Sequence, residues 1–182
     1  FIAGFQYPWE AERFYEQLRS RMAKFGLELE ENKSRIVESG RYLASLKAKR
    51  GESTRLGTFD FLGFTFYCGR TTKGNPWIMP KTSSKKFRQK VKEIKIWLYN
   101  NKEQKLGKLM YMLNVKLVGH YRYYGISFNS RMISNYKQQV RELLYKVLNR
   151  RSEKKSYTRE GFIEMMKYYK LVNPKIYYSL FC

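Results

Sequence analysis

The spacing of apolar residues changes near residue 81, and this change constrains the fold more than any other feature of the sequence. Beyond it, apolar residues recur every three or four positions, the spacing of amphipathic helices. The helices predicted in this way are one that begins after the cap candidates Ser83 and Ser84, one over 103–123, one over 129–149, and a short one over 159–169 capped by Thr158. Their short connections favour antiparallel neighbours in a bundle.

Before this change the sequence mixes one helix with short strands. Residues 9–25 have helical spacing, with Pro8 suited to the first turn and Gly26 to the stop. The other predicted segments are strands in LELE (27–30), SRIVES (34–39) and RYLASL (41–46), a basic loop over 47–55, an aromatic strand over 58–68, a turn in GRTTKGNP, and a returning hairpin strand in WIMP. Gly63 interrupts the aromatic strand and allows a bulge or the close approach of another backbone.

The order of these segments predicts an α+β chain with two domains. We expect residues 1–80 to form a helix with antiparallel strands and a hairpin. We expect residues 81–182 to form a basic helical bundle, because both the composition and the apolar spacing shift at this point.

The charge is strongly positive and unevenly distributed. The net charge is +22, of which residues 1–80 carry +4 and residues 81–182 carry +18. A field of this sign attracts polyanions irrespective of their sequence, so we predict a nucleic-acid contact in the second half. A solvated basic surface is an alternative. An anionic membrane is another, but the basic helices lack one lipid-facing stripe and no run of 18 apolar residues could span a bilayer.

The residues that usually carry catalysis are scarce. Asp60 is the only aspartate, whereas two-metal phosphoryl transfer needs clustered carboxylates. His120 is the only histidine, and with Cys68 and Cys182 it forms no zinc-binding spacing and no disulfide framework. We therefore predict no metal site in this chain, and the low cysteine content fits a reducing, cytoplasmic compartment.

Several runs resemble one known family in the order in which they occur. KFGLELEENKSRIVESGRYLASL followed by TFDFLGFTF resembles the late palm motifs of group II intron reverse transcriptases, and KLVGHYRYYGI followed by Asn129 is similar to their thumb, or maturase-specific (X), domain. The resemblance implies the end of a palm followed by a helical thumb. In that family the Tyr-x-Asp-Asp hairpin precedes a segment similar to FIAGFQYPWEAERF. We therefore expect a fragment that lacks the catalytic aspartates and is inactive alone, with Mg²⁺ a cofactor only of the full-length enzyme.

The resemblance also implies roles for individual residues. Lys33 aligns with a lysine proposed to assist the leaving pyrophosphate, although a surface lysine is an equal alternative. Phe61, Leu62, Gly63 and Phe64 align with the primer grip, although some of these aromatics must simply be core. The residues predicted to contact nucleic acid are Lys85, Lys86, Arg88, Lys92, Lys95, Lys116, His120, Arg122, Tyr123, Arg131, Lys137, Arg141, Arg150 and Arg151. Packing at a helix end is as good an explanation for any single tyrosine, a structural role is an alternative for His120, and a solvated linker is an equal alternative for Arg150 and Arg151.

These observations leave three functions open. The chain is either part of an RNA-directed DNA polymerase and maturase that binds group II intron RNA and template–primer, supporting reverse transcription and splicing, or a non-catalytic, stand-alone RNA-binding protein. A structural protein without a nucleic-acid role is the third possibility, against which the basic second half argues.

Overall fold

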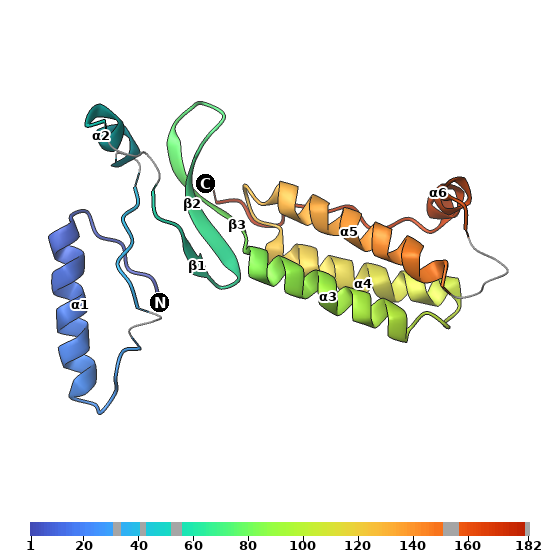
Figure 1. The fold of residues 1–182 in the computed structure, drawn as a ribbon, viewed down its shortest axis with the longest axis horizontal. Coiled ribbons are helices and arrows are strands. Elements are labelled where there is room, and N and C mark those ends of the chain that lie inside the picture. The colour runs from blue at the N-terminus through green and yellow to red at the C-terminus, as the bar shows by residue number, and fades with distance from the viewer. Residues whose placement is uncertain (31–33, 41–42, 52–55, 151–156, 181–182) are drawn as a thin grey trace. The chain divides into compact units, whose positions relative to one another are not determined.

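The fold belongs to the α+β class predicted from the sequence. The computed structural model describes residues 1–30, 34–40, 43–51, 56–150 and 157–180. Within them the elements follow the order α1 (Pro8–Ala23), α2 (Leu43–Lys49), β1 (Phe59–Phe61), β2 (Phe64–Arg70), β3 (Pro76–Thr82), α3 (Ser84–Asn100), α4 (Leu106–Tyr124), α5 (Ser130–Leu148) and α6 (Arg159–Tyr168) (Figure 1). The chain divides into two compact units, Phe1–Phe59 with Tyr67–Ile78 and Asp60–Phe66 with Met79–Cys182.

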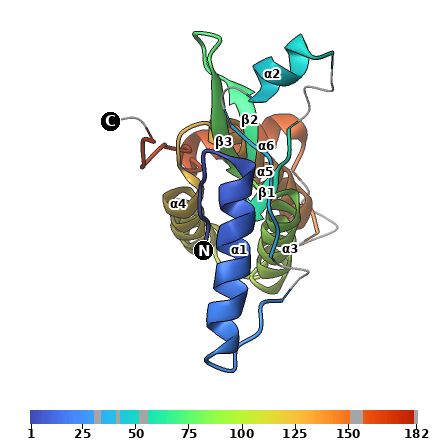
Figure 2. The ribbon, with the colours of Figure 1, turned by 90° about the vertical axis from the view of Figure 1, so that its left-hand side faces the viewer.

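Helix α1 dominates the first unit, and its predicted position is confirmed. Pro8 occupies its first turn, and the Glu10 carboxylate accepts hydrogen bonds from the backbone N–H groups of Gln6 and Tyr7. The helix gives way to a turn at Gly26, where φ is +67°. An extended segment then runs back beside the helix (Figures 1 and 2). No residue of α1 is buried, so the helix has no face that is covered by a hydrophobic core.

Three predicted strands are wrong. The described residues of LELE and SRIVES are irregular, and the described part of RYLASL begins helix α2, which continues to Lys49 inside the predicted loop. An extended segment becomes a strand only through a ladder of backbone hydrogen bonds. Here single bonds occur instead, such as the one from Gly57 N to Glu38 O at 3.3 Å. Leucine, alanine and lysine also have high helix propensity, which explains α2.

The strands form a three-stranded sheet in the order β1-β2-β3, joined by two hairpin connections. The predicted return of WIMP as a hairpin strand is confirmed by β3, and the turn before it closes with a bond from Thr71 N to Asn75 O at 2.8 Å. The aromatic run over 58–68 is not one bulged strand. It reverses direction at Leu62 and Gly63, because both residues adopt positive φ and leave only a two-residue loop between β1 and β2.

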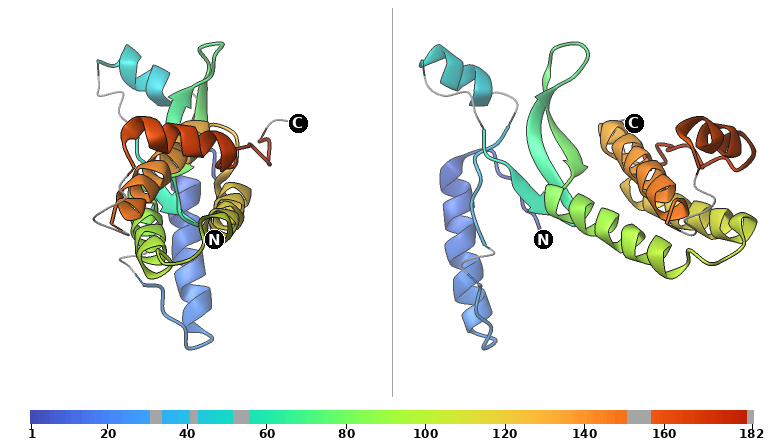
Figure 3. Two further views of the ribbon diagram at one scale, coloured as in Figure 1. Left: turned by 90° about the vertical axis from the view of Figure 1, so that its right-hand side faces the viewer. Right: turned by 45° about the vertical axis from the view of Figure 1, so that its right-hand side comes forward.

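Helices α3, α4 and α5 lie side by side in the second unit and share one core (Figures 1 and 3). Ser83 caps α3 by accepting a hydrogen bond from Lys86 N, and Thr158 caps α6 in the same way through Gly161 N. The four predicted helices of this half are confirmed to within a few residues at their ends. The side chains that are completely excluded from solvent at the centre of the core are Leu98, Leu109, Leu113, Leu117, Tyr121, Val140, Leu144 and Val147.

The chain after α6 turns back along the bundle toward the α4–α5 connection (Figure 1). We call residues 170–180 the C-terminal strap. Asn114 on α4 donates to Lys170 O and accepts from Val172 N, at 3.0 and 2.9 Å. Farther along, Gly125 O accepts from the backbone N–H groups of Tyr177 and Tyr178. The strap is therefore hydrogen-bonded into the helical unit at several points.

Candidate nucleic-acid interface

The β1–β2 turn is built from two consecutive residues with positive φ. Leu62 has φ +47° and Gly63 has φ +81°, the combination of a type I′ hairpin turn. Asparagine, aspartate or glycine is preferred at the first of these positions, since a branched side chain is unfavourable at positive φ. Leu62 nevertheless occupies it and leaves 68% of its surface exposed. An apolar side chain is thus displayed at the apex of a strained turn.

Residues of helix α4 and of the cap before α3 contact this turn directly. The Tyr123 hydroxyl donates to Leu62 O at 2.9 Å, and Ser83 N donates to Gly63 O at 2.9 Å. The buried Phe64 ring packs against the rings of Tyr123 and Tyr124, with centroids 6.0 and 5.3 Å apart. The predicted primer-grip residues therefore belong with the helical unit, because their contacts run to its tyrosines and to its first helix cap.

Gly63 has two independent reasons to be glycine. Its φ lies in the left-handed region, and a Cβ there would sit 3.2 Å from the Tyr124 hydroxyl and 3.5 Å from the Lys86 side chain. Lys86 thus lies directly beside the turn. This close approach brings together one predicted cationic residue and the predicted primer-grip glycine.

Asn129 joins three segments below the turn. It is fully buried at the start of α5, and its side-chain oxygen accepts from Thr82 N at 2.8 Å. Its amide nitrogen donates to Thr82 Oγ1 and to Tyr124 O, at 2.9 and 2.8 Å. One side chain therefore fixes the end of β3, the end of α4 and the beginning of α5 relative to one another.

His120 lies inside the bundle. Only 9% of it is exposed, and its ring stacks on Tyr136 of α5 with a centroid distance of 3.7 Å. Burial, helped by the nearby charge of Lys90, lowers its pKa to about 4. The ring is therefore neutral near pH 7. These features support packing between α4 and α5, and not the phosphate contact predicted for it.

Helix α3 carries the clearest row of cations. Lys85, Arg88, Lys92 and Lys95 recur at three- and four-residue intervals, so they lie along one stripe, and all four are exposed. In the part of the chain that the structure describes, no ion pair involves Lys85, Lys92 or Lys95. Because the buried Ile94 and Leu98 face elsewhere, this stripe is available to phosphates in solution.

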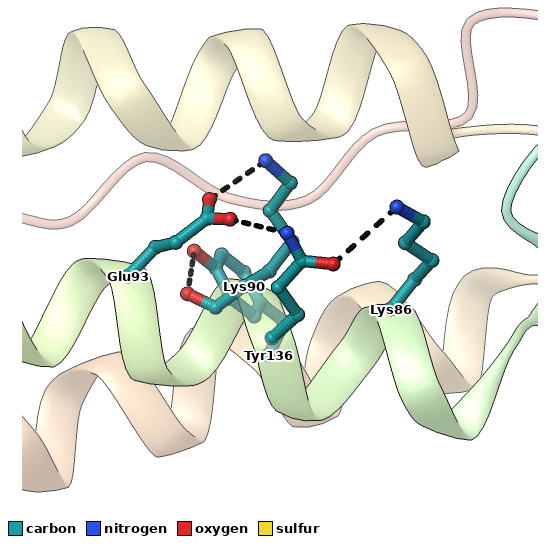
Figure 4. A network of polar contacts seen from close by, with 5 residues as sticks. Lys86, Lys90, Glu93 and Tyr136 are labelled. Carbon is teal, nitrogen blue, oxygen red and sulfur yellow. Dashed lines mark hydrogen bonds and ion pairs between the residues drawn. The ribbon is translucent and has the colours of Figure 1, made fainter.

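The other flank of α3 is partly neutralised. Lys90 pairs with Glu93 at 2.8 Å, and Gln89 links Glu93 to Lys86 (Figure 4). The hydrogen bond from Lys90 lowers the pKa of the Glu93 carboxyl, because it favours the ionised form. The Tyr136 hydroxyl approaches Lys90 O at 3.5 Å and connects α5 to this network. Glu93 therefore offsets the charge of Lys90, whereas Lys86 bonds the neutral amide of Gln89 and keeps its charge.

The remaining predicted cations differ in their exposure and in the side chains that they contact. Arg122, Arg131 and Arg141 are exposed. Lys116 stands over the Trp97 ring at 5.0 Å, and the Arg150 guanidinium donates to the Tyr99 hydroxyl at 2.8 Å. Lys33 and Arg151 lie outside the described residues.

Lys137 is the one predicted cation of α5 that is half-buried. Its ammonium donates to Asn173 in the C-terminal strap. Burial, together with the charge of Arg141, lowers its pKa. Lys137 therefore ties the strap to α5, a contact that its predicted role did not include.

Comparison with known protein families identifies the helical part of the chain. Residues 84–169, from α3 to the end of α6, match the model of the group II intron, maturase-specific domain. This segment belongs to that family. The resemblance to group II intron maturases is thereby confirmed, and it links the chain to group II intron splicing. Searches of curated proteins and of solved structures found no match.

The maturase-specific domain contains an organising residue to which the sequence analysis gave no role. In the sequence Asn129 stands out only by its place after KLVGHYRYYGI, whereas in the structure its side chain bonds both Thr82 and Tyr124. A polar residue directly before a strongly periodic helix was the available signal, but it suggests a cap. Asn129 makes no side-chain cap bond, because its side chain is engaged with Thr82 and Tyr124.

Over the described ranges, no three histidine, cysteine, aspartate or glutamate side chains group in a way that could hold a metal ion. The single aspartate, Asp60, accepts a hydrogen bond from the Thr65 hydroxyl across the β1–β2 hairpin. None of the helices found in that part of the chain combines the length and hydropathy needed to cross a bilayer.

Proposed function

We propose that the helical unit binds group II intron RNA, and that the β1–β2 turn acts as the primer grip of a group II intron reverse transcriptase, at the border of its palm and thumb. The observation that carries the RNA-binding proposal is the exposed Lys85–Lys95 stripe on the first helix of a maturase-specific domain. Exposed lysines can each release counterions from a phosphate backbone. The net charge of +18 beyond residue 81 supports the same assignment.

Charge reversal of the stripe tests RNA binding. We expect Lys85→Glu, Lys92→Glu and Lys95→Glu together to weaken binding to structured intron RNA and to a random RNA of equal length alike. The slope of log affinity against log salt should fall by about 3, roughly one for each phosphate that the variant no longer neutralises. Gel-shift titrations between 50 and 200 mM salt measure both quantities.

A charge-conserving variant is the matched control. Lys85→Arg, Lys92→Arg and Lys95→Arg together should retain both the affinity and the salt slope, because guanidinium also binds phosphate. Unchanged affinity in the glutamate variant would show that the RNA contact lies elsewhere. Binding that does not vary with salt would remove the nucleic-acid proposal altogether.

Primer extension separates the polymerase proposal from RNA binding without polymerisation. The latter is favoured for this polypeptide by its single aspartate, which is engaged with Thr65. With Mg²⁺, deoxynucleotides and a template–primer, we expect no extension by these 182 residues alone. Extension is expected only when a palm segment with clustered carboxylates is supplied. Extension by the chain alone would mean that its own carboxylates assemble a catalytic metal site.

A further inference from the structure

The strained β1–β2 turn is contacted by a side chain of the helical unit, Tyr123 on α4. Leu62 adopts a conformation that leucine avoids, so surrounding contacts must hold it there. One contact acts directly on its backbone, the hydrogen bond from the Tyr123 hydroxyl to Leu62 O. The Tyr123 ring also stacks on Phe64, the first residue of β2, with an interplanar angle of 12°. Tyr123 therefore touches both sides of the turn.

The geometry points to Tyr123 as a positioning residue that fixes the Leu62–Gly63 turn for a nucleic-acid end. This inference rests on the proposed primer-grip function of the turn, and it adds a positioning role to the nucleic-acid contact predicted for Tyr123. Its hydroxyl donates to Leu62 O and one face of its ring covers Phe64, so the exposed Leu62 side chain is held in place for a ligand. Removing the hydroxyl alone should loosen the turn while the ring keeps its packing.

Ser83 provides an internal reporter of the turn. Its backbone N–H donates to Gly63 O, and Ser83 is only 4% exposed. If the turn opens, this amide loses its acceptor and exchanges its proton with solvent. We expect Tyr123→Phe to speed exchange of the Ser83 amide about fivefold, as for the loss of one ordinary hydrogen bond. Amide exchange measured by NMR on the full chain gives this quantity directly.

Tyr111→Phe is the matched control. Tyr111 lies on the same helix, and 72% of it is exposed, so removing its hydroxyl tests the chemistry of the substitution without touching the turn. Exchange at Ser83 should stay at the wild-type rate in this variant. Equal exchange in wild type, Tyr111→Phe and Tyr123→Phe would overturn the positioning role.

Relief of the strain offers a second, independent test. Leu62→Asn places at the turn a residue that accepts positive φ, so the turn should depend less on Tyr123. In the Leu62→Asn background, Tyr123→Phe should change Ser83 exchange by less than about half of its effect in wild type. Full additivity of the two substitutions would contradict the inference, even if Tyr123→Phe also lowered overall stability.

Binding measurements connect the turn to its ligand. Affinity is compared for an RNA–DNA duplex with a recessed 3′ end and for the same duplex made blunt. We expect wild type to favour the recessed end, and Tyr123→Phe to lose about fivefold of that preference while single-stranded RNA binding is unchanged. A preference that survives Tyr123→Phe intact would overturn the inference. A wild type without any preference would instead remove the primer-grip proposal, and Ser83 exchange would still decide whether Tyr123 fixes the turn.

Discussion

The two units have helices with similar apolar spacing, but they bury those apolar residues to different extents. Helix α1 repeats apolar residues every three or four positions, yet none is buried: Trp9 is 56% exposed, and Phe25 in the turn that follows is 73% exposed. Helices α3, α4 and α5 have the same spacing and bury it completely at residues such as Leu98 and Leu113. Apolar residues at helical spacing thus predict a helix, but whether its apolar face is buried depends on which other elements pack against it.

The largest expected effect comes from the centre of the bundle. Leu113 has no exposed surface, so Leu113→Ala should lower the free energy of unfolding by about 3–4 kcal/mol through reduced burial and a cavity. Urea unfolding followed by circular dichroism measures the change. Val115→Ala is the control, since Val115 is 55% exposed on the same helix and should cost under about 1 kcal/mol. Similar losses in the free energy of unfolding for both variants would contradict the difference in burial between Leu113 and Val115.

Replacing Asn129 should have the next largest effect on stability. Asn129→Ala leaves Thr82 N and Tyr124 O without their buried partner, and we expect a loss of about 3 kcal/mol in the free energy of unfolding. Asn135→Ala, on the exposed side of α5, serves as the control and should be nearly neutral. Unfolding by urea checks both. A loss below about 1 kcal/mol would mean that the segments joined by Asn129 hold together without it.

His120 should make the helical unit sensitive to acid. Its pKa falls from 6.5 to about 4 on folding, so between these values the unfolded chain binds a proton that the folded chain excludes. Stability should therefore fall as pH drops from 6.5 to 4, by about 2–3 kcal/mol, and this contribution should level off below pH 4. His120→Phe keeps an aromatic ring beside Tyr136 and should remove this part of the pH dependence. An unchanged slope in the variant would contradict the burial of His120.

The smallest effect is expected in the first unit. Phe25→Ser should change the free energy of unfolding by less than about 0.5 kcal/mol, because the ring is largely exposed in the described structure. Thermal unfolding of wild type and variant provides the comparison. A loss of more than about 2 kcal/mol would show that Phe25 is covered in solution and would narrow the contrast between the units.

The sequence predicted those elements whose apolar spacing extends over several turns. The caps at Ser83 and Thr158 and the helices of the second half followed from such spacing. The short runs between residues 27 and 46 could not be assigned, because strand formation depends on a partner that a local pattern does not contain. The type I′ turn was missed for a related reason, since Leu62 is an unfavourable residue there and only tertiary contacts hold it.

The candidate site was predicted in part. Local patterns marked the cations of α3 and the glycine of the turn, and Gly63 does lie beside Lys86. The burial of His120 was missed although its spacing indicates it: His120 follows Leu113 and Leu117 by seven and three residues and so continues their buried stripe on α4. The Asn129 network joins residues that lie 5 and 47 positions apart in sequence, and only a three-dimensional structure reveals such pairs.

The attachment of the C-terminal strap at Gly125 matters for anyone who trims or labels this protein. A side chain at Gly125 would meet Lys175 O at 2.4 Å, so that position has room for the returning backbone and for nothing else. The family match ends at residue 169, before the strap begins. Cutting there would remove the hydrogen-bond partners of Asn114 and, at the α4–α5 corner, the two backbone N–H groups that bond Gly125 O. A label attached at residue 180, whose backbone N–H donates to the Ser127 hydroxyl, would lie beside that corner.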